Sequence, residues 1–175
     1  MTGPAPGAVT RVVTPTAAAT ERLGRCLAGV LRAGDLLVLS GDLGAGKTTL
    51  TRGLGEGLGV CGQVTSPTFV IARVHPGTQG RPALVHVDAY RLGGLAELED
   101  LDLETSLETA VTVVEWGEGL AEGLAADRLE VRLARPRGGR ADIGDGPEAR
   151  TVELRGVGGR WLGVDLDAVL RPAGD

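Results

Sequence analysis

One short stretch of the chain combines glycines, a lysine and a threonine at the spacing of a phosphate-binding loop. Residues 41–48 read GDLGAGKT and match the pattern G-x-x-x-x-G-K-[ST] at every fixed position. Glycines let backbone N–H groups turn toward phosphate oxygens, because no Cβ stands in the way. Lys47 is the only lysine in the sequence. We expect it to reach the β- and γ-phosphates of a nucleotide, and the Thr48 hydroxyl to ligate Mg²⁺.

The flanking residues predict the elements that must hold this loop. The apolar run 36–39 predicts a buried strand, and leucines at 50, 54 and 58 give helical spacing over 48–58. Strand, glycine loop and helix is the arrangement that the pattern requires, and the N-terminal end of such a helix attracts the same anion. The sequence therefore predicts a nucleotide site rather than a solvated glycine-rich turn.

Two further apolar strands end in carboxylates. The segment ALVHVD ends at Asp88 and VTVVE ends at Glu115. Ligands of α/β sheets bind at the carboxyl ends of the strands. One carboxylate would ligate Mg²⁺ and the other would orient the attacking water, and the residues by themselves fit either assignment. Because two such ends accompany a phosphate loop, we interpret both as functional.

The turn SPTF and one tryptophan are weaker candidates. Thr68 follows the first helix at the place where nucleotide switches sense the γ-phosphate, but Ser66–Phe69 taken alone favours a simple turn. Trp116 follows Glu115 directly, and an isolated tryptophan more often packs in a core than lines a site.

The histidines and the late arginines receive simpler interpretations. We interpret His75 and His86 as structural or solvated residues, since neither has metal-ligand spacing to a cysteine. Arg135, Arg137 and Arg140 would suit a phosphate lid, but a solvated loop explains them more simply.

Composition sets the class of protein. The 175 residues are 42% hydrophobic and 2% aromatic, which favours a single domain over 1–175 whose core is built from Val, Leu and Ala. A net charge of −5 argues against broad electrostatic binding of nucleic acid, so we expect any contact with RNA to be made through a partner protein. Cys26 and Cys61 are isolated, and no run approaches the roughly 18 apolar residues of a membrane span. We expect a cytoplasmic protein with reduced thiols.

The predicted architecture is an α/β P-loop NTPase fold. A central, largely parallel sheet is flanked by helices, with antiparallel strands toward the C-terminus. The other predicted elements are a loose tail over 1–8, an edge strand over 11–13, a helix over 16–32 capped at Thr14-Pro15, a strand over 68–74, an acidic, partly helical segment over 96–107, an antiparallel pair over 127–134 and 150–156 joined by a mobile loop over 135–149, and a short C-terminal helix.

Five motifs in order resemble a known family. GDLGAGKTTLTRG, VTSPTF, HVDAYRL, ELEDLDLE and VEWGEGL cover about residues 40–120 and resemble the TsaE (formerly YjeE) family. These are small bacterial ATPases required for tRNA threonylcarbamoyladenosine biosynthesis. The order of five motifs is far more specific than the phosphate loop alone.

The resemblance implies a Mg²⁺-dependent ATPase that is slow alone and acts on the TsaB–TsaD heterodimer. That assembly attaches a threonylcarbamoyl group to adenosine 37 of tRNAs reading ANN codons, and ATP hydrolysis supports its turnover. This protein would contact the tRNA only indirectly, through the complex. The resemblance assigns phosphate binding to Gly44, Ala45, Gly46, Lys47, Thr48 and Thr49, metal binding to Thr48 and Glu115, catalysis to Asp88 with Glu115, and a functional surface to Ser66, Thr68 and Trp116.

Competing interpretations differ in class. A small-molecule kinase would use the same loop with the late arginines as its lid. A GTPase lacks its Asn-Lys-x-Asp signature here, because Lys47 is the only lysine, and an ABC-type ATPase would need a Ser-Gly-Gly signature and a longer chain. A nucleotide-gated binding module would use the acidic stretch 97–104 as a docking face.

Overall fold

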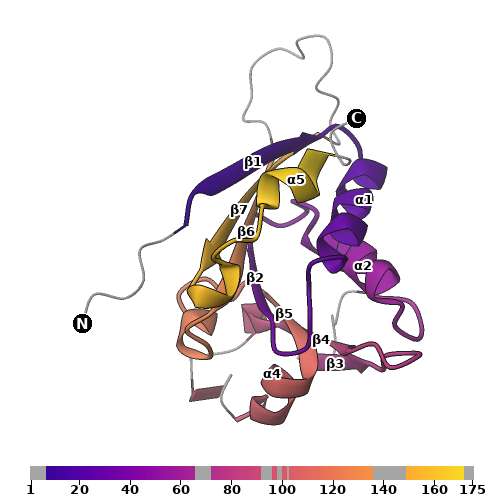
Figure 1. Ribbon diagram of the computed structural model, residues 1–175, viewed down its shortest axis with the longest axis vertical. Coiled ribbons are helices and arrows are strands. Elements are labelled where there is room, and N and C mark those ends of the chain that lie inside the picture. The colour runs from indigo at the N-terminus through magenta and orange to yellow at the C-terminus, as the bar shows by residue number, and fades with distance from the viewer. Residues whose placement is uncertain are drawn as a thin grey trace.

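A seven-stranded sheet forms the centre of the molecule (Figure 1). The computed structural model of the chain describes residues 7–65, 72–91, 96–97, 100–101, 103–135 and 149–171. Its strands are β1 (Val9–Thr14), β2 (Leu36–Ser40), β3 (Ala72–His75), β4 (Ala83–Asp88), β5 (Ala110–Glu115), β6 (Arg128–Ala134) and β7 (Arg150–Val157).

The strand order is β1-β7-β6-β2-β5-β4-β3. The four central strands β6, β2, β5 and β4 run parallel, while β7 and β1 on one edge and β3 on the other pair antiparallel. Every residue of β5 is buried, as expected for a parallel strand covered on both faces. The predicted P-loop NTPase fold and the antiparallel pair near the C-terminus are confirmed.

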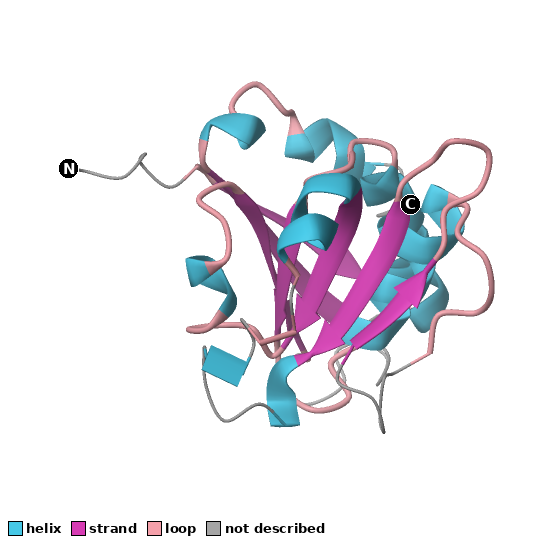
Figure 2. Cartoon of the chain, turned by 90° about the horizontal axis from the view of Figure 1, so that it is seen from below, coloured by secondary structure: helices cyan, strands magenta, loops and turns pink. Residues whose placement is uncertain are grey.

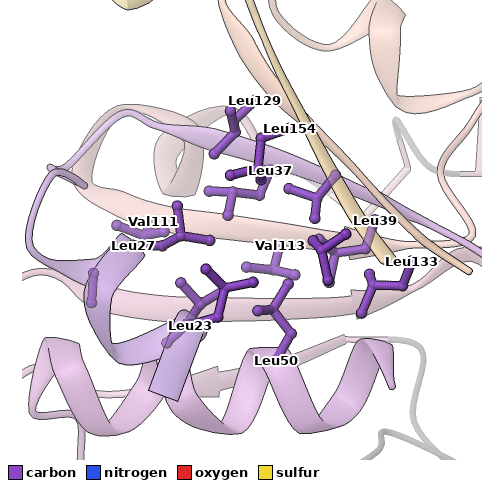
Figure 3. Close-up of a cluster of buried hydrophobic side chains, with 14 of the residues drawn as sticks. Leu23, Leu27, Leu37, Leu39, Leu50, Val111, Val113, Leu129, Leu133 and Leu154 are labelled. Atoms are coloured by element: carbon purple, nitrogen blue, oxygen red, sulfur yellow. The ribbon is translucent and has the colours of Figure 1, made fainter. Parts of the chain in front are cut away.

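Helices lie on both sides of the sheet (Figure 2). One face carries α1 (Ala17–Ala28), α2 (Lys47–Leu58) and α5 (Leu166–Leu170), and the other carries α4 (Glu104–Thr109). Short 3₁₀ turns follow as η1 (Ala89–Arg91), η2 (Ala121–Gly123) and η3 (Gly159–Trp161). The larger core lies between the sheet and the α1–α2 pair, where Leu23, Leu50 and Val113 point toward one another (Figure 3).

Glycines let α1 and α2 pack with their backbones close together. A Cβ added at Gly24 would lie 2.3 Å from the Leu50 carbonyl oxygen, and one added at Gly53 would lie 2.0 Å from that of Glu21. Any larger side chain would push the helices apart. This close packing fixes α2, and with it the loop at the N-terminal end of α2.

The start and the end of α1 differ from the prediction. Thr16, not Thr14, caps the helix, with its side chain accepting a hydrogen bond from the Ala19 N–H at 3.1 Å. Thr14 is instead the last residue of β1. The helix ends at Ala28 instead of Arg32, because residues 29–31 tighten into i→i−3 hydrogen bonds and the Asp35 carboxylate accepts from the Arg32 N–H at 2.9 Å.

The described residues cover some of the remaining predicted elements fully and others only in part. The predicted edge strand 11–13 is part of the longer strand β1, and the predicted C-terminal helix is confirmed as α5. The acidic segment is helical at 96–97 and again in α4. Residues 1–6, 66–71 and 136–148 lie outside the described part. These residues include most of the predicted tail, most of the predicted loop and the start of the predicted strand 68–74. Within the described residues, no helix has the length and apolar character needed to cross a membrane.

Candidate active site

The glycine loop joins β2 to α2 with a backbone that only glycine adopts easily. Gly41, Gly44 and Gly46 have φ of 142°, 75° and 102°. Gly46 is the N-cap of α2 and offers no side-chain hydrogen bond to the first turn. The first N–H groups of a helix have no partner within it, so this end of α2 is ready to bind an anion.

Lys47 lies at the base of the loop and is 5% exposed. Its ammonium donates to the carbonyl oxygens of Gly41 at 2.7 Å and Asp42 at 2.9 Å. Burial lowers the pKa of Lys47, while the charges of Glu115, Asp42 and Asp88 oppose that shift. Phosphate oxygens would compete with the two carbonyls for this cation.

The two strand-end carboxylates lie side by side. Strands β4 and β5 are neighbours, and Asp88 is paired with Glu115 in their register. Glu115 is 4% exposed, and its Oε1 accepts from Thr48 Oγ1 at 3.2 Å and contacts His86 Nε2 at 2.8 Å. Asp88 is only partly buried, and its Oδ1 accepts from the Tyr90 N–H at 3.0 Å. The sequence predicted both acids at this edge of the sheet, and the structure brings them together.

A cavity of about 470 Å³ opens over these groups. Its lining residues are Leu43, Gly44, Gly46, Lys47, Thr48, Thr49, Asp88, Tyr90, Glu115 and Trp116. The structure thus brings together the predicted residues of the loop and of both strand ends. Ala45 is the exception: it does not line the cavity, and its side chain is buried.

Trp116 lines the cavity instead of packing in the core. Its ring lies 3.9 Å from Lys47 Nζ, measured to the ring centroid, and 5.1 Å from the Tyr90 ring. The backbone at Trp116 has φ of 60°, which is rare outside glycine, and its N–H donates to the Leu39 carbonyl at 3.0 Å. The packing interpretation drawn from the residues alone is therefore wrong.

Two arginines hold the glycine loop: Arg135, which directly follows β6, and Arg150, the first residue of β7. Arg135 Nη2 donates to the Gly44 carbonyl at 3.0 Å, and Arg150 donates to the carbonyls of Gly44 at 3.2 Å and Ala45 at 3.1 Å. Arg135 is therefore not simply part of a solvated loop. The predicted candidates Arg137, Arg140, Ser66 and Thr68 lie outside the described residues.

Sequence reasoning missed the roles of His86 and Tyr90. His86 is fully buried against Glu115, so it is not solvated. A signal was present, since His86 precedes Asp88 by two residues in a strand and must point to the same face of the sheet. Tyr90 follows the strand end and lines the cavity. His75 is buried as a structural residue, and burial lowers its pKa.

The donor groups of the cavity fit a nucleotide bound with Mg²⁺. The hydroxyl of Thr48 and the carboxylate of Glu115 are oxygen donors, which Mg²⁺ prefers. The described residues contain no group of three or more His, Cys, Asp or Glu side chains that would hold a metal ion by themselves. Mg²⁺ is commonly held by one or two protein oxygens together with substrate phosphates, and Thr48 and Glu115 would supply the protein oxygens here.

Comparison with known proteins agrees with this geometry. The sequence model of the family described as "Threonylcarbamoyl adenosine biosynthesis protein TsaE" matches residues 14–141. The chain belongs to the TsaE family. The resemblance seen in the five motifs is thereby confirmed.

Individual relatives cover most of the chain. The Streptomyces coelicolor tRNA threonylcarbamoyladenosine biosynthesis protein TsaE is 63% identical over 150 residues, covering 85% of this chain and 98% of the relative. The Bacillus subtilis protein of the same name is 36% identical over 143 residues, covering 81% and 82%. The crystal structure of Bacillus subtilis YdiB matches with a TM-score of 0.68 and 28% identity, covering 95% of this chain and 94% of that one.

Proposed function

We propose that the protein binds ATP with Mg²⁺, hydrolyses it, and thereby supports threonylcarbamoyladenosine formation at position 37 of tRNAs reading ANN codons. It would act on the TsaB–TsaD complex, whose turnover needs the hydrolysis. One observation carries the enzymatic part: Lys47, Thr48 and the paired carboxylates Asp88 and Glu115 line a single cavity. Membership of the TsaE family supports the biosynthetic part.

Each group of the cavity has a task in this proposal. The glycine loop and the first N–H groups of α2 bind the phosphates, and Lys47 neutralises the β- and γ-phosphates. Thr48 and Glu115 hold the Mg²⁺. The cation, when bound, neutralises charge that develops on the phosphate oxygens.

The environments of the two acids favour one assignment of their roles. Glu115 Oε1 is already engaged by Thr48 and His86, so this carboxylate is fixed beside the metal-binding hydroxyl. Asp88 is more exposed and is bonded at Oδ1 by a backbone N–H. A carboxylate with remaining acceptor capacity that lines the cavity is suited to orient a water molecule and accept its proton.

The mouth of the cavity supports a partner-dependent activity. Leu43 at the tip of the loop is 86% exposed and Tyr90 is 70% exposed. A partner that docked at this mouth would remove the apolar area of both side chains from water, which would favour its binding. We expect slow hydrolysis by the protein alone. Contact with tRNA only through the complex and a cytoplasmic location are further parts of the proposal, and they rest on the likeness to the TsaE family.

Hydrolysis measured with and without the partner tests the proposal. ATP turnover by the purified protein should rise when TsaB–TsaD is added, and many rounds of tRNA modification should require this chain. Lys47→Ala and Asp88→Asn should abolish both effects. Asp167→Asn, an exposed acid on α5, should behave like wild type.

The opposite result would point to another class of enzyme. If TsaB–TsaD has no effect while a small acceptor stimulates ADP release, the protein is a small-molecule kinase. If the partner binds in an ATP-dependent way and Asp88→Asn supports full modification, the protein is a nucleotide-gated binding module instead.

A further inference from the structure

His86 is a buried histidine in contact with the candidate metal ligand. It lies on β4, is 0% exposed, and its Nε2 is 2.8 Å from Glu115 Oε1. The roles described above leave this residue without a task. A polar ring enclosed between strands and a helix is costly to bury unless it forms hydrogen bonds, so its contact needs an explanation.

The position of the ring proton follows from its surroundings. Nδ1 of His86 is buried and has no hydrogen-bond partner among the described residues. A proton on Nδ1 would therefore be a buried donor without an acceptor, whereas a proton on Nε2 is accepted by the Glu115 carboxylate. The Nε2–H tautomer is the one that this geometry supports.

Both donors to Glu115 bind the same oxygen. Thr48 Oγ1 and His86 Nε2 contact Oε1, and no described residue hydrogen-bonds to Oε2. Holding one oxygen of a carboxylate fixes its torsion and leaves the other oxygen to bind elsewhere. Thr48, however, is also the residue whose oxygen a Mg²⁺ ion would use, so His86 is the donor that does not compete for the cation.

We propose that His86 is a positioning residue: its Nε2–H holds Glu115 Oε1 so that Oε2 faces a Mg²⁺ ion bound at Thr48. The inference rests on the proposed function, because it concerns the metal of the same site. His86 does not touch nucleotide or metal. It acts by limiting the orientations of Glu115, as outer groups around metal ligands commonly do.

Two substitutions and one control separate positioning from packing. His86→Leu removes the donor, while His86→Gln keeps an N–H donor near the place of Nε2. His75→Leu is the matched control, since His75 is also buried, on the adjacent strand β3, and its Nε2 has no partner among the described residues. Thermal unfolding of each variant reports whether it is folded.

The affinity for an ATP analogue with an uncleavable β–γ bridge is measured in Mg²⁺ and in EDTA. The ratio of the two affinities isolates the contribution of the metal. We expect His86→Leu to lower this ratio about 10-fold while its affinity in EDTA stays within about 2-fold of wild type. His86→Gln and His75→Leu should keep the wild-type ratio.

Several results would overturn the inference. Equal losses in Mg²⁺ and EDTA, an unchanged ratio in His86→Leu, or failure of His86→Gln to restore the ratio would each reduce His86 to a structural residue. If wild type itself does not bind the analogue, the proposed function fails instead. Nitrogen NMR of the wild-type histidines needs no variant: the protonated nitrogen of His86 should be Nε2, and a proton on Nδ1 contradicts the proposal.

Discussion

The floor and the rim of the cavity are built differently. The floor consists of the buried residues Lys47 and Glu115, each hydrogen-bonded to neighbouring groups, with His86 buried behind Glu115 and in contact with it. The rim consists of Leu43, Asp88 and Tyr90, which are partly or largely exposed. Groups that are buried and bonded keep their geometry, whereas exposed groups with few partners are free to respond. Under the proposed function, we expect binding to depend on the buried groups of this chain and turnover to depend on a partner that meets the rim.

The largest expected effect separates the two regions by function. Asp88→Asn should lower the rate of ATP hydrolysis about 1000-fold, because it removes the group that accepts a proton from water. Its nucleotide affinity in Mg²⁺ should stay within about 3-fold of wild type. A parallel loss of affinity and rate would place Asp88 with the floor and break the comparison.

The floor is tested by Lys47→Ala. Losing a charged donor to the phosphates should weaken nucleotide binding about 100-fold, or about 2.7 kcal/mol. Titration of the analogue, followed through the fluorescence of Trp116 beside Lys47, measures this. Arg52→Ala on α2 removes another cation and should change affinity less than about 3-fold. Comparable losses in both variants would mean that general positive charge, rather than Lys47, binds the phosphates.

The close packing of α1 against α2, which positions the floor of the cavity, is tested by Gly53→Ala. Alanine normally stabilises a helix by about 1 kcal/mol relative to glycine. Here the new Cβ would lie 2.0 Å from the Glu21 carbonyl oxygen, so we expect a net loss of about 1–3 kcal/mol in the free energy of unfolding. Denaturant unfolding measures it. Gly159→Ala is the control, because a Cβ there meets no atom within 4 Å.

The smallest effect is expected at the rim, and only with the partner. Leu43→Ser should leave nucleotide affinity of the isolated protein unchanged within about 2-fold. It should weaken binding to TsaB–TsaD about 10-fold, or about 1.4 kcal/mol of lost apolar burial. Leu162→Ser, which changes another largely exposed leucine near the C-terminus, should change neither. Equal weakening by both substitutions would argue against a partner at the rim.

Local patterns in the sequence predicted the loop, the strand ends and the fold class. The glycine spacing at 41–48 and the apolar runs before Asp88 and Glu115 depend on neighbouring residues, so they can be recognised without a structure. The contact of His86 with Glu115 joins residues 29 positions apart, and that of Arg150 with Ala45 joins residues 105 apart. The strand period places His86 on the same face as Asp88, but it does not show which residue His86 meets, because such contacts depend on strand order and register.

The end of α1 shows the same limit on a smaller scale. The sequence predicted a helix that continues beyond Ala28 to Arg32. The turn is instead fixed by the Asp35 side chain, which also binds Arg160 through contacts of 2.8 and 2.9 Å. A residue 125 positions away thus takes part in ending the helix where it does.

A crystal structure with Mg²⁺ and the uncleavable ATP analogue tests the central claim most directly. The account predicts a cation about 2.0–2.1 Å from Thr48 Oγ1, facing Glu115 Oε2 directly or through one water, while His86 stays on Oε1. Asp88 should lie beside a water aligned with the γ-phosphate, without ligating the metal. A cation bound by Asp88, with Oε2 of Glu115 turned away from it, would contradict the division between floor and rim.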